Sequence, residues 1–204
     1  MPKAYTPNDR LAKRAQFQGY RARSVFKLQE LDEKFNLIKF NQRILDIGAA
    51  PGSWLQYVSE KIGKKGIAVG VDLKEIIPVS NNVFTKVVDI TNTEEVLGFL
   101  NQLKIDKFDL VLSDIAPNTS GIPGVDHAKS VELSQMCVNA ADIYLRSGGS
   151  LIMKVFDGVE MGDFLKPLRN KYGFVTVYKV RSSRDRSREV YVVCQRKKPS
   201  LRTE

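Results

Sequence analysis

Short apolar runs alternate with amphipathic stretches from Arg43 almost to the end of the chain. A short apolar run between turn residues indicates a buried strand, and apolar residues three to four positions apart indicate a helix. Strands that alternate with helices favour a mostly parallel sheet with helices on both of its faces. The alternation therefore predicts an open α/β fold.

The positions of the elements follow from the same patterns. Strands are expected at 43–48, 66–72, 83–90, 108–114, 148–156, 174–180 and 188–196. Helices are expected at 24–35, 53–63, 91–103, 128–145 and 161–171. The last two strands flank the basic stretch 181–188 and are expected to form an antiparallel pair. The prediction is thus a seven-stranded, mostly parallel sheet with an antiparallel C-terminal strand.

Basic residues are concentrated at the two ends of the chain, whose net charge is +9. Residues 1–27 hold seven basic and one acidic side chains, residues 179–204 hold nine and three, and the middle is slightly acidic. Two basic ends around such a middle favour a surface that binds a polyanion, so nucleic acid is the expected partner. Solvated basic tails are the alternative. The candidates for phosphate contacts are Arg10, Lys13, Arg14, Arg21, Arg23, Arg181, Arg184, Arg186 and Arg188.

Length and composition favour one domain. A chain of 204 residues with 43% hydrophobic side chains can bury one substantial core. We expect a single domain over 1–204, with a basic extension at 1–22 and a tail at 197–204. Its apolar runs stay well short of the roughly 20 residues that cross a bilayer, and the N-terminus lacks the apolar core of a secretory signal. We therefore expect a monomer in the cytoplasm, without membrane association.

The cysteines and the single histidine suggest no metal site. Cys137 and Cys194 lie far apart, inside expected regular elements, so they favour neither a disulfide framework nor zinc binding. His127 has no neighbours of the kind that complete a metal site. All three residues are expected to be ordinary core residues.

Four acidic residues end strands of the expected parallel sheet, at the edge where ligands bind in such folds. They are Asp46, Asp72, Asp89 and Asp114. Asp46 opens the small-residue loop 46–52 (DIGAAPG), in which two glycines allow a ligand to approach the backbone closely. The glycine spacing and Pro51 disfavour a dinucleotide-phosphate loop, and no Gly-Lys-Ser/Thr follows to make a P-loop.

The second and third of these carboxylates suit an adenosine. Asp72 can accept hydrogen bonds from both ribose hydroxyls, and Asp89 can accept one from the adenine amino group. Each has a structural alternative, because an aspartate after a strand often caps the following helix. Thr91 and Thr93 make that alternative stronger for Asp89.

Four sequence blocks resemble the FtsJ (RrmJ, RlmE) family of ribose 2′-O-methyltransferases. They are LDIGAAPGSWLQYV, SDIAPNTSG, MKVFDG and SSRDRSREVYVV, and the resemblance runs from about Ala22 to Arg196. It implies a Rossmann-like fold of the S-adenosylmethionine-dependent methyltransferases, with S-adenosylmethionine as the cofactor. Ser53 is one departure, where bacterial members have glycine. The residues implied in cofactor binding are Gly48, Pro51, Gly52, Trp54, Asp72, Asp89 and Asp114.

The resemblance also implies a catalytic tetrad of Lys27, Asp114, Lys154 and Glu189. Methyl transfer to an alcohol requires alignment and removal of a proton. Neutral Lys154 is the first candidate to take that proton, provided that burial and Lys27 outweigh the two carboxylates. If Lys154 stays charged, it would orient the hydroxyl instead, and Asp114 would be the base.

The residues favour a hydroxyl acceptor over a nucleobase. The sequence at 114–118 (DIAPN) lacks the aromatic residue with which amino-directed enzymes stack a flipped base, and neither cysteine lies in a loop suited to attack on a pyrimidine. The resemblance implies a uridine in large-subunit (23S-type) ribosomal RNA, within the assembled subunit. A transfer RNA anticodon loop is the alternative substrate. A dinucleotide-dependent oxidoreductase and a non-catalytic RNA-binding assembly factor are the competing functions.

Overall fold

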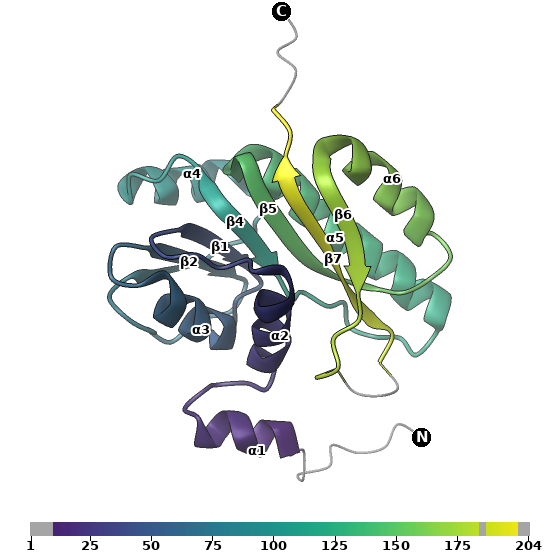
Figure 1. Cartoon of the computed structure of the whole chain (residues 1–204), viewed down its shortest axis with the longest axis horizontal. Helices are drawn as coiled ribbons and strands as arrows, with labels where there is room; N and C mark the ends of the chain where they lie inside the picture. The colour runs from purple at the N-terminus through teal and green to yellow at the C-terminus, as the bar shows by residue number, and fades with distance from the viewer. Residues whose placement is uncertain (1–9, 184–186, 200–204) are drawn as a thin grey trace, which may run out of the picture.

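The structure is a computed structural model that describes residues 10–183 and 187–199. Strands and helices alternate along the chain as the sequence predicts (Figure 1). The helices are α1 (Arg10–Phe17), α2 (Val25–Phe35), α3 (Ser53–Ile62), α4 (Thr93–Gln102), α5 (Pro123–Tyr144) and α6 (Met161–Lys171). The strands are β1 (Arg43–Ile47), β2 (Ile67–Asp72), β3 (Val83–Val87), β4 (Phe108–Ser113), β5 (Leu145–Phe156), β6 (Tyr172–Tyr178) and β7 (Glu189–Lys197).

The strands form one seven-stranded sheet in the order β3-β2-β1-β4-β5-β7-β6. Strands β1 to β5 pair in parallel, and β7 runs antiparallel between β5 and β6. This confirms the predicted sheet and its antiparallel C-terminal strand. The strand order reverses between β1 and β4, and open sheets of this kind bind ligands beyond the carboxyl ends of the strands at that point.

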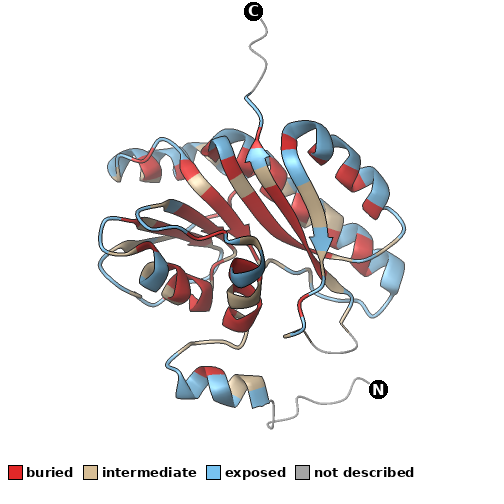
Figure 2. Cartoon of the chain, in the orientation of Figure 1, coloured by how far each residue is buried: buried red, intermediate tan, exposed pale blue. Residues whose placement is uncertain are grey.

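Helices cover both faces of the sheet, and the buried residues lie between the layers (Figure 2). Helices α2 and α3 pack on one face, where Leu28 and Leu55 meet sheet residues such as Ile152. Helices α4, α5 and α6 pack on the other face around Phe108 and Tyr144. The inner parallel strands β1, β2 and β4 are buried on both sides, which explains why they are continuous apolar runs rather than alternating ones, whereas the edge strand β3 is partly exposed.

Helix α2 places its buried stripe over the end of the sheet where the parallel strands finish (Figure 1). Its residues Val25, Leu28 and Leu31 are fully buried, at the helical spacing seen in the sequence. The helix ends at Phe35, and the next residue, Asn36, adopts the left-handed conformation that closes a last turn. Lys27 therefore lies on a helix held in place by its buried stripe, one position from Leu28 of that stripe.

Several boundaries differ from the prediction. Helix α1 was not predicted, because only Ala15 of its residues is fully buried and its sequence shows no apolar stripe. Helix α5 begins at Pro123 rather than at 128, since proline suits the first turn of a helix. Strand β5 begins at Leu145, before the glycine pair that suggested its start, and its register against β4 shifts across those glycines.

Candidate active site

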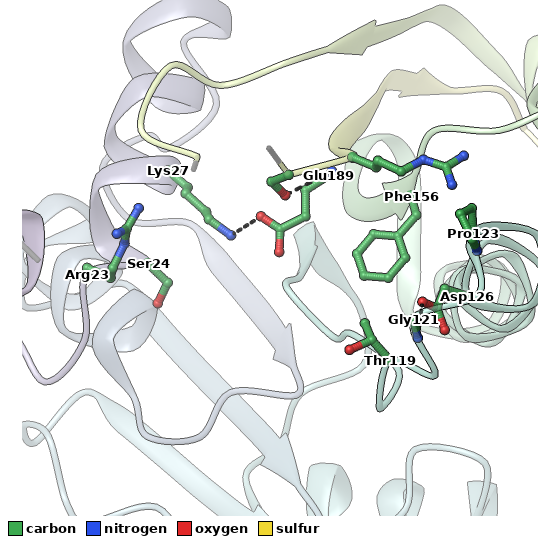
Figure 3. Close-up of a pocket in the computed structure, with 11 residues that line it drawn as sticks. Arg23, Ser24, Lys27, Thr119, Gly121, Pro123, Asp126, Phe156 and Glu189 are labelled. Carbon is green, nitrogen blue, oxygen red and sulfur yellow. Dashed lines mark hydrogen bonds and ion pairs between the residues drawn. The ribbon is translucent and has the colours of Figure 1, made fainter. Parts of the chain in front are cut away.

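The structure brings the four residues of the predicted tetrad together. Lys154 Nζ lies 3.0 Å from Asp114 Oδ1 and also donates to the Asp114 backbone oxygen. Lys27 Nζ donates to Glu189 Oε2 at 2.8 Å and lies 3.8 Å from Asp114 Oδ1. Figure 3 shows the Lys27–Glu189 pair at the edge of a pocket. Two lysine amino groups and two carboxylates thus lie together in one cluster.

Three neighbouring strands and one helix hold these groups. Asp114 directly follows β4, and Lys154 lies near the end of β5, the next strand in the sheet. Glu189 begins β7, which runs the other way, so its first residue lies beside the last residue of β5. The antiparallel direction of β7 is therefore what brings Glu189 to the carboxyl edge of the parallel strands.

The tetrad is largely shielded from solvent. The side chain of Lys154 is 5% exposed, that of Lys27 11%, that of Asp114 18% and that of Glu189 22%. Burial acts to raise the pKa of the Glu189 carboxyl, but the Lys27 ammonium holds this pKa below its ordinary value. Glu189 is consequently an anion at neutral pH and a fixed partner for Lys27.

Tyr191 is a site residue that the sequence interpretation missed. Its hydroxyl donates to Asp114 Oδ1 at 2.5 Å, and its ring is fully buried. It pairs with Lys154 across the β5–β7 ladder. Spacing could have revealed it, because residues two apart on a strand share a face and Tyr191 is two residues after Glu189.

A pocket of about 580 Å³ opens beside Lys27 and Glu189, and we call it the outer pocket (Figure 3). It lies at the meeting of α2, the loop after β4, the start of α5 and the loop before β7. Its lining residues are Arg23, Ser24, Lys27, Thr119, Gly121, Pro123, Asp126, Phe156, Ser187, Arg188 and Glu189.

A second pocket, of about 310 Å³, lies at the ends of β1, β2 and β4, and we call it the inner pocket. Four of the residues predicted to bind the cofactor line it, namely Gly48, Asp72, Asp89 and Asp114. Apolar side chains such as Ile90 and Met136 complete its walls. The inner pocket therefore combines carboxylates with an apolar surface, as a nucleoside site requires.

A small cavity of about 50 Å³ contains Asp46 at the end of β1, and Trp54 and Asp114 also line it. Asp46 is 1% exposed, and its Oδ2 has no hydrogen-bond partner among the described residues. Burial, reinforced by Asp114 and Asp72, raises the pKa of this carboxyl well above its ordinary value. A buried, unpartnered carboxylate of this kind suits a cationic or hydrogen-donating ligand group.

The two predicted adenosine contacts are both partly used within the protein. Asp72 accepts from the backbone N–H groups of Ala50 and Lys74. Asp89 Oδ1 accepts from the backbone and hydroxyl of Thr91, which lowers its pKa. Asp89 does not cap α4, since Asn92 does. Both carboxylates still line the inner pocket.

The remaining predicted cofactor residues lie on the loop between β1 and α3. Gly48 has φ +74°, and a Cβ there would lie 2.2 Å from the Ile115 side chain, so this position requires glycine. Pro51 is exposed, and Gly52 is buried next to Arg21. The Trp54 ring is buried and its Nε1 donates to the Ser24 backbone oxygen, as expected for a ring that packs.

The basic residues expected to bind phosphate divide into groups. Arg21 donates to backbone oxygens of Pro51, Ile77 and Pro78, so it fastens two loops of the protein together. Arg23 and Arg188 line the outer pocket. Helix α1 carries Arg10, Lys13 and Arg14, and Arg181 follows β6. Arg184 and Arg186 lie outside the described residues.

The cysteines and the histidine are buried. Burial raises the pKa of Cys137 to about 11 and that of Cys194 to about 12, so both stay neutral thiols. His127 contacts the Phe156 backbone oxygen through Nδ1 and accepts from the Glu160 backbone through Nε2. Within the described ranges there is no cluster of metal ligands and no helix long and apolar enough to cross a membrane.

Comparisons with known proteins agree with this geometry. The model of the FtsJ-like methyltransferase family matches residues 20–197. A protein of Methanothrix thermoacetophila named Ribosomal RNA large subunit methyltransferase E is 42% identical over 185 residues, which cover 91% of this chain and 71% of the relative. A protein of the same name from Methanobrevibacter smithii is 39% identical over 186 residues, which cover 91% and 89%.

A solved structure from Plasmodium falciparum, described as that of a ribosomal RNA methyltransferase, has the same fold. Its TM-score is 0.78 at 31% identity, and the match covers 89% of this chain and 100% of that one. The chain therefore belongs to the FtsJ-like methyltransferase family, as its sequence blocks predict.

Proposed function

We propose that this chain transfers the methyl group of S-adenosylmethionine to a ribose 2′-hydroxyl in large-subunit (23S-type) ribosomal RNA. The observation that carries the proposal is the gathering of Lys27, Asp114, Lys154 and Glu189 at one point between two pockets. The names of the relatives supply the substrate class. The chain would act as a monomer on the assembled large subunit, since one chain supplies all four groups.

The inner pocket fits S-adenosylmethionine, which the family uses. Asp72 and Asp89 would receive the ribose hydroxyls and the adenine amino group. Asp46 would receive the amino group of the methionine part, because its buried Oδ2 is unpartnered and an ammonium offsets the cost of a buried carboxylate. When bound there, the cofactor supplies a methyl group on a sulfonium.

The tetrad would align the acceptor. Lys154 is held by both the side chain and the backbone of Asp114, so its amino group has a fixed direction. Such a group can hold a hydroxyl oxygen in line with the methyl carbon, and alignment of two reactants can supply ~7–11 kcal/mol of the barrier. Proton removal contributes typically a hundred- to ten-thousandfold in addition. Neutral Lys154 would take the proton of the 2′-hydroxyl. If Lys154 is charged, Asp114 would take this proton instead.

RNA would approach from the side of the outer pocket. Arg23 and Arg188 line this pocket, and α1 lies on the same side of the molecule (Figure 1). Arginines hold phosphates without reading sequence, so the choice of RNA depends on its shape.

The decisive experiment replaces Lys154. Lys154→Ala should abolish methyl transfer to large ribosomal subunits from cells that lack this protein, while the Kd for S-adenosylmethionine, measured by calorimetry, stays within about threefold of the wild type. Lys154→Met tests the loss of the amine without a cavity, and Lys166→Ala on the exposed side of α6 is the control. Near-wild-type turnover of both Lys154 variants would refute the proposal.

A further inference from the structure

The outer pocket has an aromatic wall that methyl transfer to a ribose oxygen does not by itself require. Phe156 is the last residue of β5, and its ring points into the pocket between Glu189 and Thr119 (Figure 3). The side chain is half-buried, so one part of the ring packs and another stays accessible.

Phe156 is fixed relative to the tetrad. It follows Lys154 by two residues on β5, so both side chains lie on the same face of the sheet, and it pairs with Glu189 across the β5–β7 ladder. Opposed residues in such a ladder have Cβ atoms about 4.5–5.5 Å apart. The ring is therefore an immediate neighbour of the groups that would hold the ribose.

The backbone of Phe156 is also held from the other face of the sheet. Its N–H donates to Ser130 Oγ at 3.0 Å, and its carbonyl oxygen contacts His127 Nδ1 at 2.6 Å. Both partners belong to α5 and are buried. Helix α5 thus fixes the Phe156 backbone, from which the ring projects, before any ligand arrives, which lowers the entropy cost of binding.

The chemistry of a nucleotide places its base close to this ring. The 2′-carbon of a ribose is bonded to the 1′-carbon that carries the base, so a 2′-oxygen at the tetrad brings the base within a few bonds of it. The inner pocket lies on the other side of Asp114, and the outer pocket adjoins Lys27 and Glu189. Its volume of about 580 Å³ falls in the range of small-molecule sites.

The part of the pocket wall formed by the loop after β4 is polar, and its one charged neighbour, Asp126, is bonded to that loop. Thr119 and Gly121 belong to the loop after β4, and Asp126 holds this loop by accepting from the Ser120 and Gly121 backbones. The Asp126 carboxylate is thus engaged with its own loop. An aromatic face opposite a hydroxyl and backbone groups is the arrangement that binds a flat ring with polar edges.

We propose that the outer pocket is a nucleobase site, in which the base of the methylated nucleotide leaves its helix and stacks on Phe156. The inference rests on the proposed function, and it adds the conformation that the target nucleotide must adopt. Bases inside a duplex cannot reach such a ring, so the target must be unpaired or flipped out. Stacking accepts any base, since every base has a π-face, and so Phe156 positions the nucleotide without selecting its identity.

The test compares three variants on large ribosomal subunits from cells that lack this protein. Phe156→Leu keeps an apolar side chain but removes the stacking face, and it should lower kcat/KM for the subunits by about 5- to 150-fold. Phe156→Tyr keeps the ring and should stay within about threefold of the wild type. Phe174→Leu, on the half-exposed β6, removes a ring far from the pocket and should have no effect.

Two results would overturn the inference. One is a Phe156→Leu enzyme with wild-type kcat/KM, and the other is an equal loss in Phe156→Leu and Phe156→Tyr, which would indicate packing rather than stacking. The affinity for S-adenosylmethionine should be unchanged in every variant. Lys154→Ala separates the two proposals: if it is inactive while Phe156→Leu is normal, only the base site is wrong. If Lys154→Ala is active, the proposed function fails, and the base site with it.

Discussion

Asp114 Oδ1 is the atom on which the candidate site converges. Tyr191 donates to it at 2.5 Å, Lys154 lies 3.0 Å away and Lys27 3.8 Å away. Hydrogen bonds to a charged group are worth ~1.5–3 kcal/mol, about twice those between neutral groups. The position of this carboxylate, and through it the direction of Lys154, therefore depends on three partners.

Tyr191→Phe removes one of these partners and leaves the ring in place. We expect kcat to fall about tenfold or more, because Asp114 then has freedom to turn away from Lys154. Tyr172→Phe is the matched control, since the Tyr172 hydroxyl is buried without a partner among the described residues. Steady-state kinetics should show the loss for Tyr191→Phe alone, and equal kcat values for both variants would argue against the role of the hydroxyl.

Asp46→Asn should weaken cofactor binding and strengthen the fold. Burial raises the pKa of Asp46 above its ordinary value of 3.8, so ionisation costs the folded state stability as the pH rises from about that value. The amide removes this cost, and it also removes the anion proposed to hold the amino group of the cofactor. We expect a higher Tm above pH 5 and a Kd for S-adenosylmethionine raised about tenfold or more.

A variant with unchanged cofactor affinity would contradict the role of Asp46. A variant with lower Tm at neutral pH would contradict the assigned cost of its burial. Calorimetry and thermal unfolding on the same sample distinguish these outcomes.

At the scale of elements, helix α5 fixes the active-site end of β5. Ser134 Oγ donates to the Lys154 backbone oxygen, Ser130 Oγ accepts from the Phe156 N–H, and His127 contacts the Phe156 oxygen. A small polar stripe on one helix thus holds the strand end that carries two proposed site residues. His127, expected only to fill the core, belongs to this stripe.

Gly158→Ala tests the coupling between α5 and the loop after β5. A Cβ at Gly158 would lie 2.4 Å from the His127 ring, and that ring is buried, so the loop must move. We expect a higher KM for ribosomal subunits with little change in the affinity for S-adenosylmethionine. Gly162→Ala is the control, because a Cβ there meets nothing within 4 Å. Equal KM values for the two variants would show that the loop does not shape the outer pocket.

The sequence predicted elements well where burial makes a simple pattern. The continuous apolar runs of β1, β2 and β4 and the carboxylates that end β1, β2 and β4 could be identified directly. Helix α1 could not, since its stability depends on contacts such as Arg14 over the Phe26 ring rather than on an apolar stripe. Elements stabilised by tertiary contacts leave a weak local pattern.

Site residues whose role depends on tertiary contacts were likewise harder to predict from the sequence. The tetrad could be predicted through a family resemblance, and its member Glu189 shares a strand face with Tyr191. The residues that Tyr191 and Phe156 contact depend instead on which strands are neighbours. Tyr191 faces Lys154, and Phe156 faces Glu189, only because β7 inserts antiparallel beside β5. The register between two strands that lie more than thirty positions apart in the chain is not visible in local sequence.

At the scale of the whole molecule, the charge distribution should govern RNA affinity. Helix α1, the outer pocket and the segment after β6 all carry arginines. Each phosphate contact contributes a slope of about −0.7 to −0.9 in a plot of log K against log salt. Arg10→Ala and Arg181→Ala should each reduce the slope by about that amount, and Lys166→Ala on α6 should not. If none of these three substitutions alters the slope, the RNA must bind elsewhere on the surface.

In the proposed reaction the methyl group reaches a ribose oxygen and not a base. The most direct measurement incubates the chain with methyl-labelled S-adenosylmethionine and large ribosomal subunits from cells that lack it, and in parallel with transfer RNA. The RNA is then digested and its nucleosides are identified by mass spectrometry. We predict label in one 2′-O-methylated nucleoside of the large-subunit RNA. Label in a base-methylated nucleoside, or in transfer RNA alone, would contradict the account.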